Sequence, residues 1–156
     1  MRIVIGCDPS ATPSIAVFYD GKYSSCKTCE NFDDLKQSVE IIFQKMFQSQ
    51  PVFAVETAYL GLNRRIYGIQ CANIGIIKYI TKQVGFAVIE VTPAEWQSTM
   101  HCGNTAKHKQ LKEASIIVAS SIAGTKIESD HEADAINIGA FADRRENLKT
   151  KTKKKI

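Results

Sequence analysis

The order of the periodic segments is the feature that most constrains the fold of this chain. Apolar, strand-like runs cover residues 2–7 and 14–19, and Asp20-Gly21 predicts a tight hairpin into a third strand at 22–26. The remaining expected elements are helices at 33–48, 64–84 and 105–119, strands at 52–55 and 86–91, a short helix from Thr92, and a last helix from Ser129. A hairpin followed by such alternation predicts an α/β fold with one mixed five-stranded sheet flanked by helices.

Local signals mark where several helices begin and which side they bury. Thr92 with Glu95, and Ser129 with Glu132, have the spacing of capping boxes, which predicts helix starts at both places. In the helix at 64–84, a stripe at helical spacing is expected to face the core. Its members are Ile66, Ile69, Ala72, Ile76 and Ile80.

Length and composition indicate one domain in a reducing compartment. The 156 residues are 44% hydrophobic, enough for one core and few for two. We expect a cytoplasmic protein without a membrane partner, because no segment resembles a signal peptide or a membrane span. The five cysteines are an odd number, which favours free thiols over a disulfide framework.

The positive charge is concentrated at the carboxyl end. The formal net charge is +4, yet residues 144–156 hold seven basic residues and one acidic residue, and acids slightly outnumber bases elsewhere. We therefore divide the chain into one folded domain at 1–143 and a basic tail at 144–156. A disordered, solvated tail is the preferred interpretation, and a contact with nucleic acid is the alternative.

Three acidic residues have settings that suggest chemistry. Asp8 follows the first strand, Glu56 ends the fourth, and Asp134 lies on the last helix. The order of elements resembles the RNase H-like fold, in which the first and fourth strands are neighbours, so the ends carrying Asp8 and Glu56 would meet. Adjacent carboxylates repel each other, and a divalent cation with oxygen ligands relieves that repulsion. Two Mg²⁺ ions in such a site would favour phosphodiester hydrolysis.

The last helix offers two partners for Asp134. His131 precedes it by three residues and Asp130 by four, so either shares a helix face with it. Asp130 is also explained as a first-turn acid favoured by the helix dipole.

Three motifs in this order resemble those of RuvC-type Holliday junction resolvases. They are IGCDPS at 5–10, VETAY at 55–59 and HEADAI at 131–136, and the resemblance extends over about residues 2–142. It implies a homodimeric endonuclease in which Asp8, Glu56, His131 and Asp134 hold two Mg²⁺ ions, replaceable by Mn²⁺, and activate water. Whether Asp130 or His131 partners Asp134 stays open. A bacterial or phage-infected cell, or an organelle, would be the setting.

The resemblance also implies residues that contact DNA. Tyr59 matches an aromatic residue that stacks on bases at the junction centre, although an ordinary half-buried aromatic would look the same. Either Lys107 or Lys109 matches a lysine near the cleaved phosphate, and Arg64 and Arg65 are candidates for the phosphate backbone. The expected partners are branched DNA (four-way junctions, with three-way junctions and flaps as further substrates) and a second copy of the chain, docked along 64–84.

Two other functions remain open. One is an RNase H-like nuclease acting on RNA or on an RNA–DNA hybrid, because recognition of the 2′-hydroxyl leaves no short motif. The other is a catalytically silent junction-binding protein, which the presence of all three carboxylates disfavours. Zinc at Cys26 and Cys29 has little support, since no second Cys-x-x-Cys follows.

Overall fold

One five-stranded sheet forms the centre of the molecule. The computed structural model describes residues 1–45, 50–61, 63–101 and 108–153. The strands are β1 (Ile3–Asp8), β2 (Ser14–Tyr19), β3 (Lys22–Thr28), β4 (Val52–Glu56) and β5 (Ala87–Val91). Their order is β3-β2-β1-β4-β5, antiparallel through β1–β2–β3 and parallel through β1–β4–β5. The expected mixed sheet is confirmed, and so is the adjacency of β1 and β4.

The turn between β2 and β3 is the tight hairpin that the sequence predicts. Asp20 and Gly21 have φ values of 49° and 83°, as the left-handed conformation of a two-residue hairpin requires. The Asp20 carboxylate also accepts a hydrogen bond of 2.7 Å from the backbone N–H of Arg2, which fixes the turn beside the start of β1.

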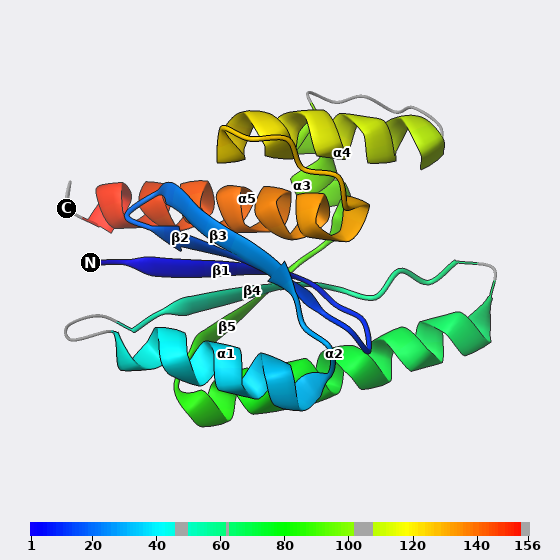
Figure 1. Cartoon of the computed structure of the whole chain (residues 1–156), viewed down its shortest axis with the longest axis horizontal. Helices are drawn as coiled ribbons and strands as arrows, with labels where there is room; N and C mark the ends of the chain where they lie inside the picture. The colour runs from blue at the N-terminus through cyan, green and yellow to red at the C-terminus, as the bar shows by residue number, and fades with distance from the viewer. Residues whose placement is uncertain (46–49, 62, 102–107, 154–156) are drawn as a thin grey trace.

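Helices cover both faces of the sheet (Figure 1). On one face lie α1 (Phe32–Gln44) and α2 (Arg64–Val84). Along the other face runs α5 (Asp130–Lys153), with α3 (Pro93–Met100) and α4 (His108–Ala123) packed outside it. No helix in the described part of the chain combines the length and apolar character that a membrane span needs.

The alternation of side chains along β1 and β4 separates two cores. Ile3, Ile5 and Cys7 point toward α1 and α2, whereas Val4 points toward α5. On the α5 face the sheet approaches the helix very closely at Gly6, where a Cβ atom would lie 2.2 Å from the carbonyl oxygen of Ala135. Glycine at this position therefore fixes how α5 sits on β1, two residues before Asp8.

Two helix starts follow their sequence signals. The Thr92 hydroxyl accepts from the backbone N–H of Glu95, and the Glu95 carboxylate accepts from that of Thr92, so the capping box of α3 is complete. At α5 the Ser129 hydroxyl accepts from the backbone N–H of Glu132. The Glu132 carboxylate accepts from the thiol of Cys26 on β3, at 3.7 Å, and so ties the helix start to the sheet.

The buried side of α2 is not the one expected. Its buried residues are Ile74, Ile77 and Thr81, because these face the sheet and α1. Of the stripe assigned to the core, Ile80 packs against this core as expected, whereas Ile66, Ile69 and Ile76 are 52%, 53% and 42% exposed. The helix is apolar on more than one side, so periodicity alone did not identify the covered side.

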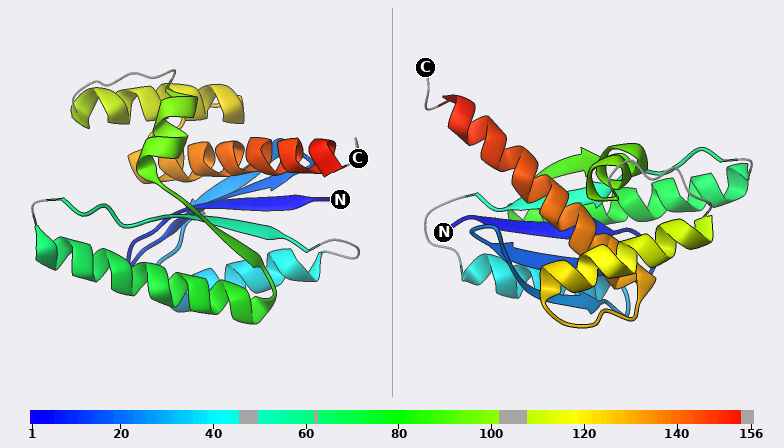
Figure 2. Two further views of the ribbon diagram at one scale, coloured as in Figure 1. Left: turned by 180° about the vertical axis from the view of Figure 1, so that it is seen from behind. Right: turned by 90° about the horizontal axis from the view of Figure 1, so that it is seen from above.

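The basic tail also differs from the prediction over its described part. Residues 144–153 continue α5 as helix, and the end of that helix extends beyond the sheet (Figure 2). Contacts with the body hold the first turn of this extension. Arg2 donates to Asn147 in this extension and to Asp143 just before it, at 2.5 Å, and the guanidinium of Arg145 donates to the backbone oxygen of Glu90 on β5 at 3.5 Å. Residues 154–156 lie outside the described part.

Candidate active site

The ends of two neighbouring parallel strands place Asp8 and Glu56 together. In the register of β1 and β4, Cys7 pairs with Val55, so the two acidic residues are the next along each strand. Both line a cavity of about 80 Å³ that also includes Gln70 and Ile74 from α2. Gly6 and Ala54 lie two residues before Asp8 and Glu56, on the same face of the sheet. Both are small, so α5 can approach this face closely.

The first turns of α5 bring His131 and Asp134 to the same place. Because α5 contacts β1 closely at Gly6, the start of the helix lies over the end of that strand. His131 Nδ1 is 2.8 Å from the Asp8 carboxylate. The Asp134 carboxylate is near enough to Asp8 and Glu56 for their charges to affect one another. The four residues selected from the sequence therefore form one cluster, although they come from β1, β4 and α5.

Burial makes Glu56 a weak acid. It raises the pKa of this carboxyl from 4.5 to about 8, and the negative charges of Asp8 and Asp134 add to the increase. The indole N–H of Trp96 donates to the carboxylate and opposes the shift.

Asp134 is affected in the same direction and has its own donor. Burial, with the charges of Asp8 and Asp130, raises its pKa from 3.8 to about 6. The Ser115 hydroxyl on α4 donates to Asp134, and the Asn137 amide donates in turn to Ser115 Oγ at 2.8 Å. This buried chain ties α4 to α5 behind the carboxylate.

The structure separates the two residues that the sequence left as alternatives. The hydrogen bond with Asp8 raises the pKa of His131 to about 8, with the charges of Asp8, Asp130 and Asp134 acting in the same direction. Asp130 turns instead to Lys112 on α4, 2.5 Å away, and that hydrogen bond lowers its pKa. His131 thus contacts the carboxylate cluster, whereas Asp130 has a cationic partner at its rim.

We expect substitutions to follow this division. For the nuclease activity that the sequence resemblance implies, His131→Ala should lower the cleavage rate by about tenfold or more, because it removes an imidazole that can transfer protons and that contacts Asp8. Asp130→Asn should cost only about 0.3–1 kcal/mol of helix stability and leave cleavage within about twofold. Single-turnover rates on a four-way junction, with melting curves for both variants, provide the measurement. The reverse ranking would place Asp130 in the site.

Solved structures with a similar fold were found at low sequence identity. No family model and no curated protein sequence matches the chain. The RuvC of Thermus thermophilus in complex with a Holliday junction substrate is 17% identical, with a TM-score of 0.70 over 94% of this chain and 96% of that one. A second Thermus thermophilus RuvC structure has 16% identity and a TM-score of 0.63, over 93% and 96% of the two chains.

This chain has the RuvC fold. The fowlpox virus resolvase, in complex with its Holliday junction DNA, has it too: it is 17% identical, with a TM-score of 0.51 over 91% of this chain and 99% of that chain. The likeness covers the described sheet and its helices almost completely. It agrees with the RNase H-like, mixed-sheet architecture expected from the order of elements.

The cluster at the sheet end of this RuvC fold has donors that suit a hard cation. As the side chains stand, no three His, Cys, Asp or Glu residues among those described are grouped to hold a metal ion. The chemistry nevertheless fits, because Asp8, Glu56 and Asp134 supply carboxylate oxygens, the preferred ligands of Mg²⁺. Glu56 and Asp134 have raised pKa values because buried like charges lack compensation, which a divalent cation would provide.

The raised pKa values predict that acidification stabilises the metal-free protein. Between its ordinary pKa of 4.5 and about 8, the folded protein keeps a proton on Glu56 that the unfolded chain releases. His131 acts in the same direction between 6.5 and about 8. Stability is therefore gained as pH falls through this range and lost as pH rises. We expect the Tm in EDTA to be lower at pH 8.5 than at pH 6 by at least about 2–4 °C, or about 1 kcal/mol.

Thermal melts of the wild type and of Glu56→Gln test this pH effect. The variant has no carboxyl at this position, so its Tm should change less between the two pH values, with the contribution of His131 remaining. A wild-type Tm that stays constant or increases toward pH 8.5 would contradict the assigned protonation.

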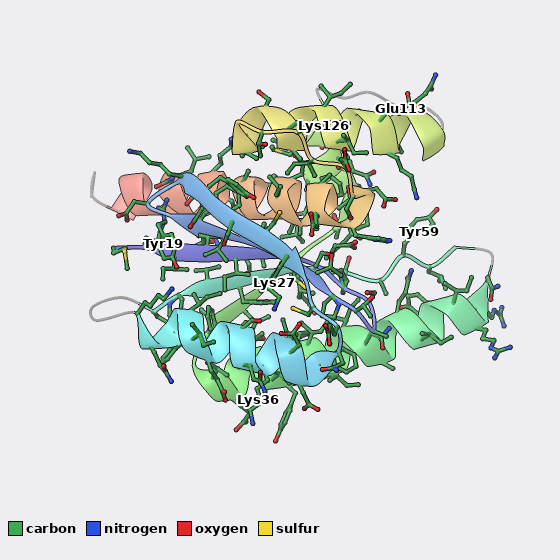
Figure 3. The ribbon with its side chains drawn as sticks, viewed as in Figure 1. Tyr19, Lys27, Lys36, Tyr59, Glu113 and Lys126 are labelled. Carbon is green, nitrogen blue, oxygen red and sulfur yellow. The ribbon has the colours of Figure 1, made fainter. Side chains whose placement is uncertain are left out.

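The structure describes only some of the residues that were expected to contact DNA, and those are exposed. Tyr59 is 71% exposed and projects from the segment between β4 and α2 (Figure 3). Arg64 and Arg65 are exposed at the start of α2, where the side chain of Asn63 caps the helix. Lys107 and the side chain of Lys109 lie outside the described part of the chain.

Several neighbours of the carboxylates were not anticipated from the sequence. Trp96 and Ser115 donate to Glu56 and Asp134, Gln70 lines the cavity, and Lys112 pairs with Asp130. The only sequence signal available for Trp96 was its rarity, since it is the single tryptophan of the chain. Ser115 and Gln70 carried no signal, because their roles depend on which helices pack together.

Proposed function

We propose that this protein is a Mg²⁺-dependent endonuclease that cuts four-way DNA junctions during DNA recombination and repair or phage DNA processing. The observation that carries the proposal is the crowding of Asp8, Glu56 and Asp134 at one end of the sheet, with raised pKa values for the latter two. The RuvC fold supports it, since two of the similar structures are complexes with Holliday junction DNA.

The chain's own residues have distinct parts in this proposal. Asp8, Glu56 and Asp134, with His131, would hold the metal ions, which when bound polarise a phosphate oxygen and lower the pKa of water. A separate donor orients each carboxylate: His131 for Asp8, Trp96 for Glu56, and Ser115 for Asp134.

Junction specificity is proposed to depend on Tyr59. Its ring is exposed beside the cavity that contains Asp8 and Glu56, so a base freed at a branch point could stack on it without a change in the fold. Tyr59→Ala should lower activity on four-way junctions by about 1–3 kcal/mol of binding, or about 5–150-fold, and much less on nicked duplex. Equal losses on all substrates, measured side by side, would assign Tyr59 to the fold instead.

We further propose that the protein acts as a homodimer joined along α2. The exposed apolar side chains of this helix, Ile66, Ile69, Ile76 and Tyr79, recur at intervals of three and seven residues and so follow one side. A twofold symmetric pair presents two sites to a junction whose two strands must be cut. A dimer interface along α2 would cover these apolar side chains, which the rest of the described chain leaves exposed.

A substrate panel is the experiment that tests the proposed function. Labelled four-way junction, three-way junction, flap, RNA–DNA hybrid and plain duplex would be incubated with Mg²⁺ and, separately, with EDTA. We expect paired cuts in the four-way junction, weaker cleavage of the other branched DNAs, and no cleavage in EDTA. Preference for the hybrid would support an RNase H-like activity, and binding without cleavage would indicate a silent junction-binding protein.

A further inference from the structure

Trp96 reaches the end of β4 from a part of the chain that the catalytic motifs do not include. In the sheet register Glu56 on β4 pairs with Val91, the last residue of β5. The chain then turns at Thr92 into α3, which rises from the end of β5 and stands beside α5 (Figures 1 and 2). Trp96 lies on this helix, and its indole Nε1–H donates to the Glu56 carboxylate.

Packing holds the indole ring in one orientation. Trp96 is 1% exposed and belongs to the core formed by the sheet, α3, α4 and α5. The ring of His101, at the end of α3, packs edge-on against it, with 5.4 Å between ring centres and 82° between planes. The capping box of Thr92 and Glu95 fixes the other end of the short helix. The direction of the N–H bond is therefore set by the core.

His101 contributes to this arrangement as a ring and not through hydrogen bonds. It is 6% exposed, and neither ring nitrogen has a hydrogen-bond partner among the described residues. Burial lowers its pKa, which favours the neutral imidazole beside Trp96.

An indole N–H is well suited to orienting a buried carboxylate. It donates but cannot accept, and it carries no charge, so it favours the ionised form of Glu56 without competing as a counter-ion. Its hydrogen bond occupies one oxygen and leaves the other available. Donors of this kind behind a metal-ligating side chain fix its orientation, and removing one commonly weakens metal affinity or activity by about 10–100-fold.

We propose that Trp96 is a positioning residue for cleavage: its indole N–H holds the Glu56 carboxylate in the orientation that metal binding requires. This inference rests on the proposed metal-dependent function. It assigns a role in the reaction to α3, a helix that contains none of the expected metal ligands.

The first test is Trp96→Phe, which keeps an aromatic ring and removes the N–H donor. We expect Mn²⁺ affinity, measured by calorimetry without DNA, to fall by about 10–100-fold, and the Mg²⁺ concentration for half-maximal cleavage to rise by a similar factor. Junction binding in EDTA should be unchanged. Phe18→Leu, a substitution in the same core, should lower the Tm and leave Mn²⁺ affinity unchanged. His101→Phe should also bind Mn²⁺ normally, because it preserves the ring contact.

The wild-type protein offers a second measurement should Trp96→Phe fail to fold. Trp96 is the only tryptophan, so its fluorescence reports on the donor to Glu56 alone. Mg²⁺ should change the emission, and Glu56→Gln should shift the metal-free spectrum and abolish the response. If the Trp96 emission did not change on adding Mg²⁺, in a sample that cleaves junctions, the inference would be overturned.

The outcomes separate this inference from the proposed function. If the wild type neither binds Mn²⁺ nor cleaves any substrate, the proposed function fails, and the positioning role fails with it. If the wild type binds Mn²⁺ and cleaves, and folded Trp96→Phe binds Mn²⁺ equally well, only the role of Trp96 is wrong.

Discussion

Replacing any one carboxylate of the cluster is expected to reduce cleavage by about 10²–10³-fold, while junction binding stays within about threefold. The variants are Asp8→Asn, Glu56→Gln and Asp134→Asn, each close in size to the original residue. Each removes a proposed metal ligand and so weakens electrostatic stabilisation at the reaction centre, where one such interaction is commonly worth about 2.7–4 kcal/mol. DNA affinity depends mainly on phosphate contacts elsewhere and should not follow the cleavage rate.

Single-turnover cleavage and EDTA binding assays on one four-way junction measure both effects. Metal-free Glu56→Gln and Asp134→Asn should also be more stable than the wild type at pH 8.5, since each removes a buried acid whose pKa is raised. Glu113→Gln, on α4, is a matched control that exchanges a carboxylate for an amide at an exposed position and should cleave normally. More than a tenth of the wild-type rate in two of the three variants would contradict the assigned site.

Introducing charged side chains on the exposed side of α2 is expected to convert the proposed dimer to a monomer. Ile69→Lys with Ile76→Lys removes two apolar side chains per protomer, and by symmetry four from the interface. A fully buried isoleucine contributes about 1.5–3 kcal/mol, so the dimer dissociation constant should rise by at least about a thousandfold. Paired incision of a junction should fall by about tenfold or more, because the two cuts would no longer come from one complex.

Sedimentation velocity across a concentration series measures this change in assembly. Ile117→Lys is the control, since Ile117 lies on α4 and is 69% exposed. It introduces the same charge at an isoleucine outside α2 and should leave the dimer intact. A double variant that still sediments as a dimer at micromolar concentration would exclude α2 as the interface.

Much of the fold could be predicted because its signals are local. Short apolar runs predicted the strands, Asp20-Gly21 predicted the hairpin, and the bounds of α2, Arg64–Val84, were predicted without error. The extension of α5 through 144–153 was missed, because a run of lysines is typical of a solvated tail and its stabilising contacts begin at Arg2 on the opposite end of the chain.

The site was predictable only in part, for a related reason. Local features selected the four site residues. Asp8 and Glu56 stand at strand ends, and His131 and Asp134 lie three residues apart on the last helix. Their partners were not selected, since Trp96 lies 40 residues from Glu56 and Ser115 lies 19 residues from Asp134. No local pattern encodes such a hydrogen bond.

The sequence by itself determined which segments form strands and helices, and which carboxylates stand at their ends, because periodicity and turn chemistry act over a few residues. The tertiary structure decided which side of α2 is covered and which donor serves each carboxylate. It also decided that His131 faces Asp8 while Asp130 faces Lys112. These contacts depend on how helices far apart in the sequence pack on the sheet, above all on the close approach of α5 to Gly6. Such packing is a property of the whole fold, so no local pattern predicts it.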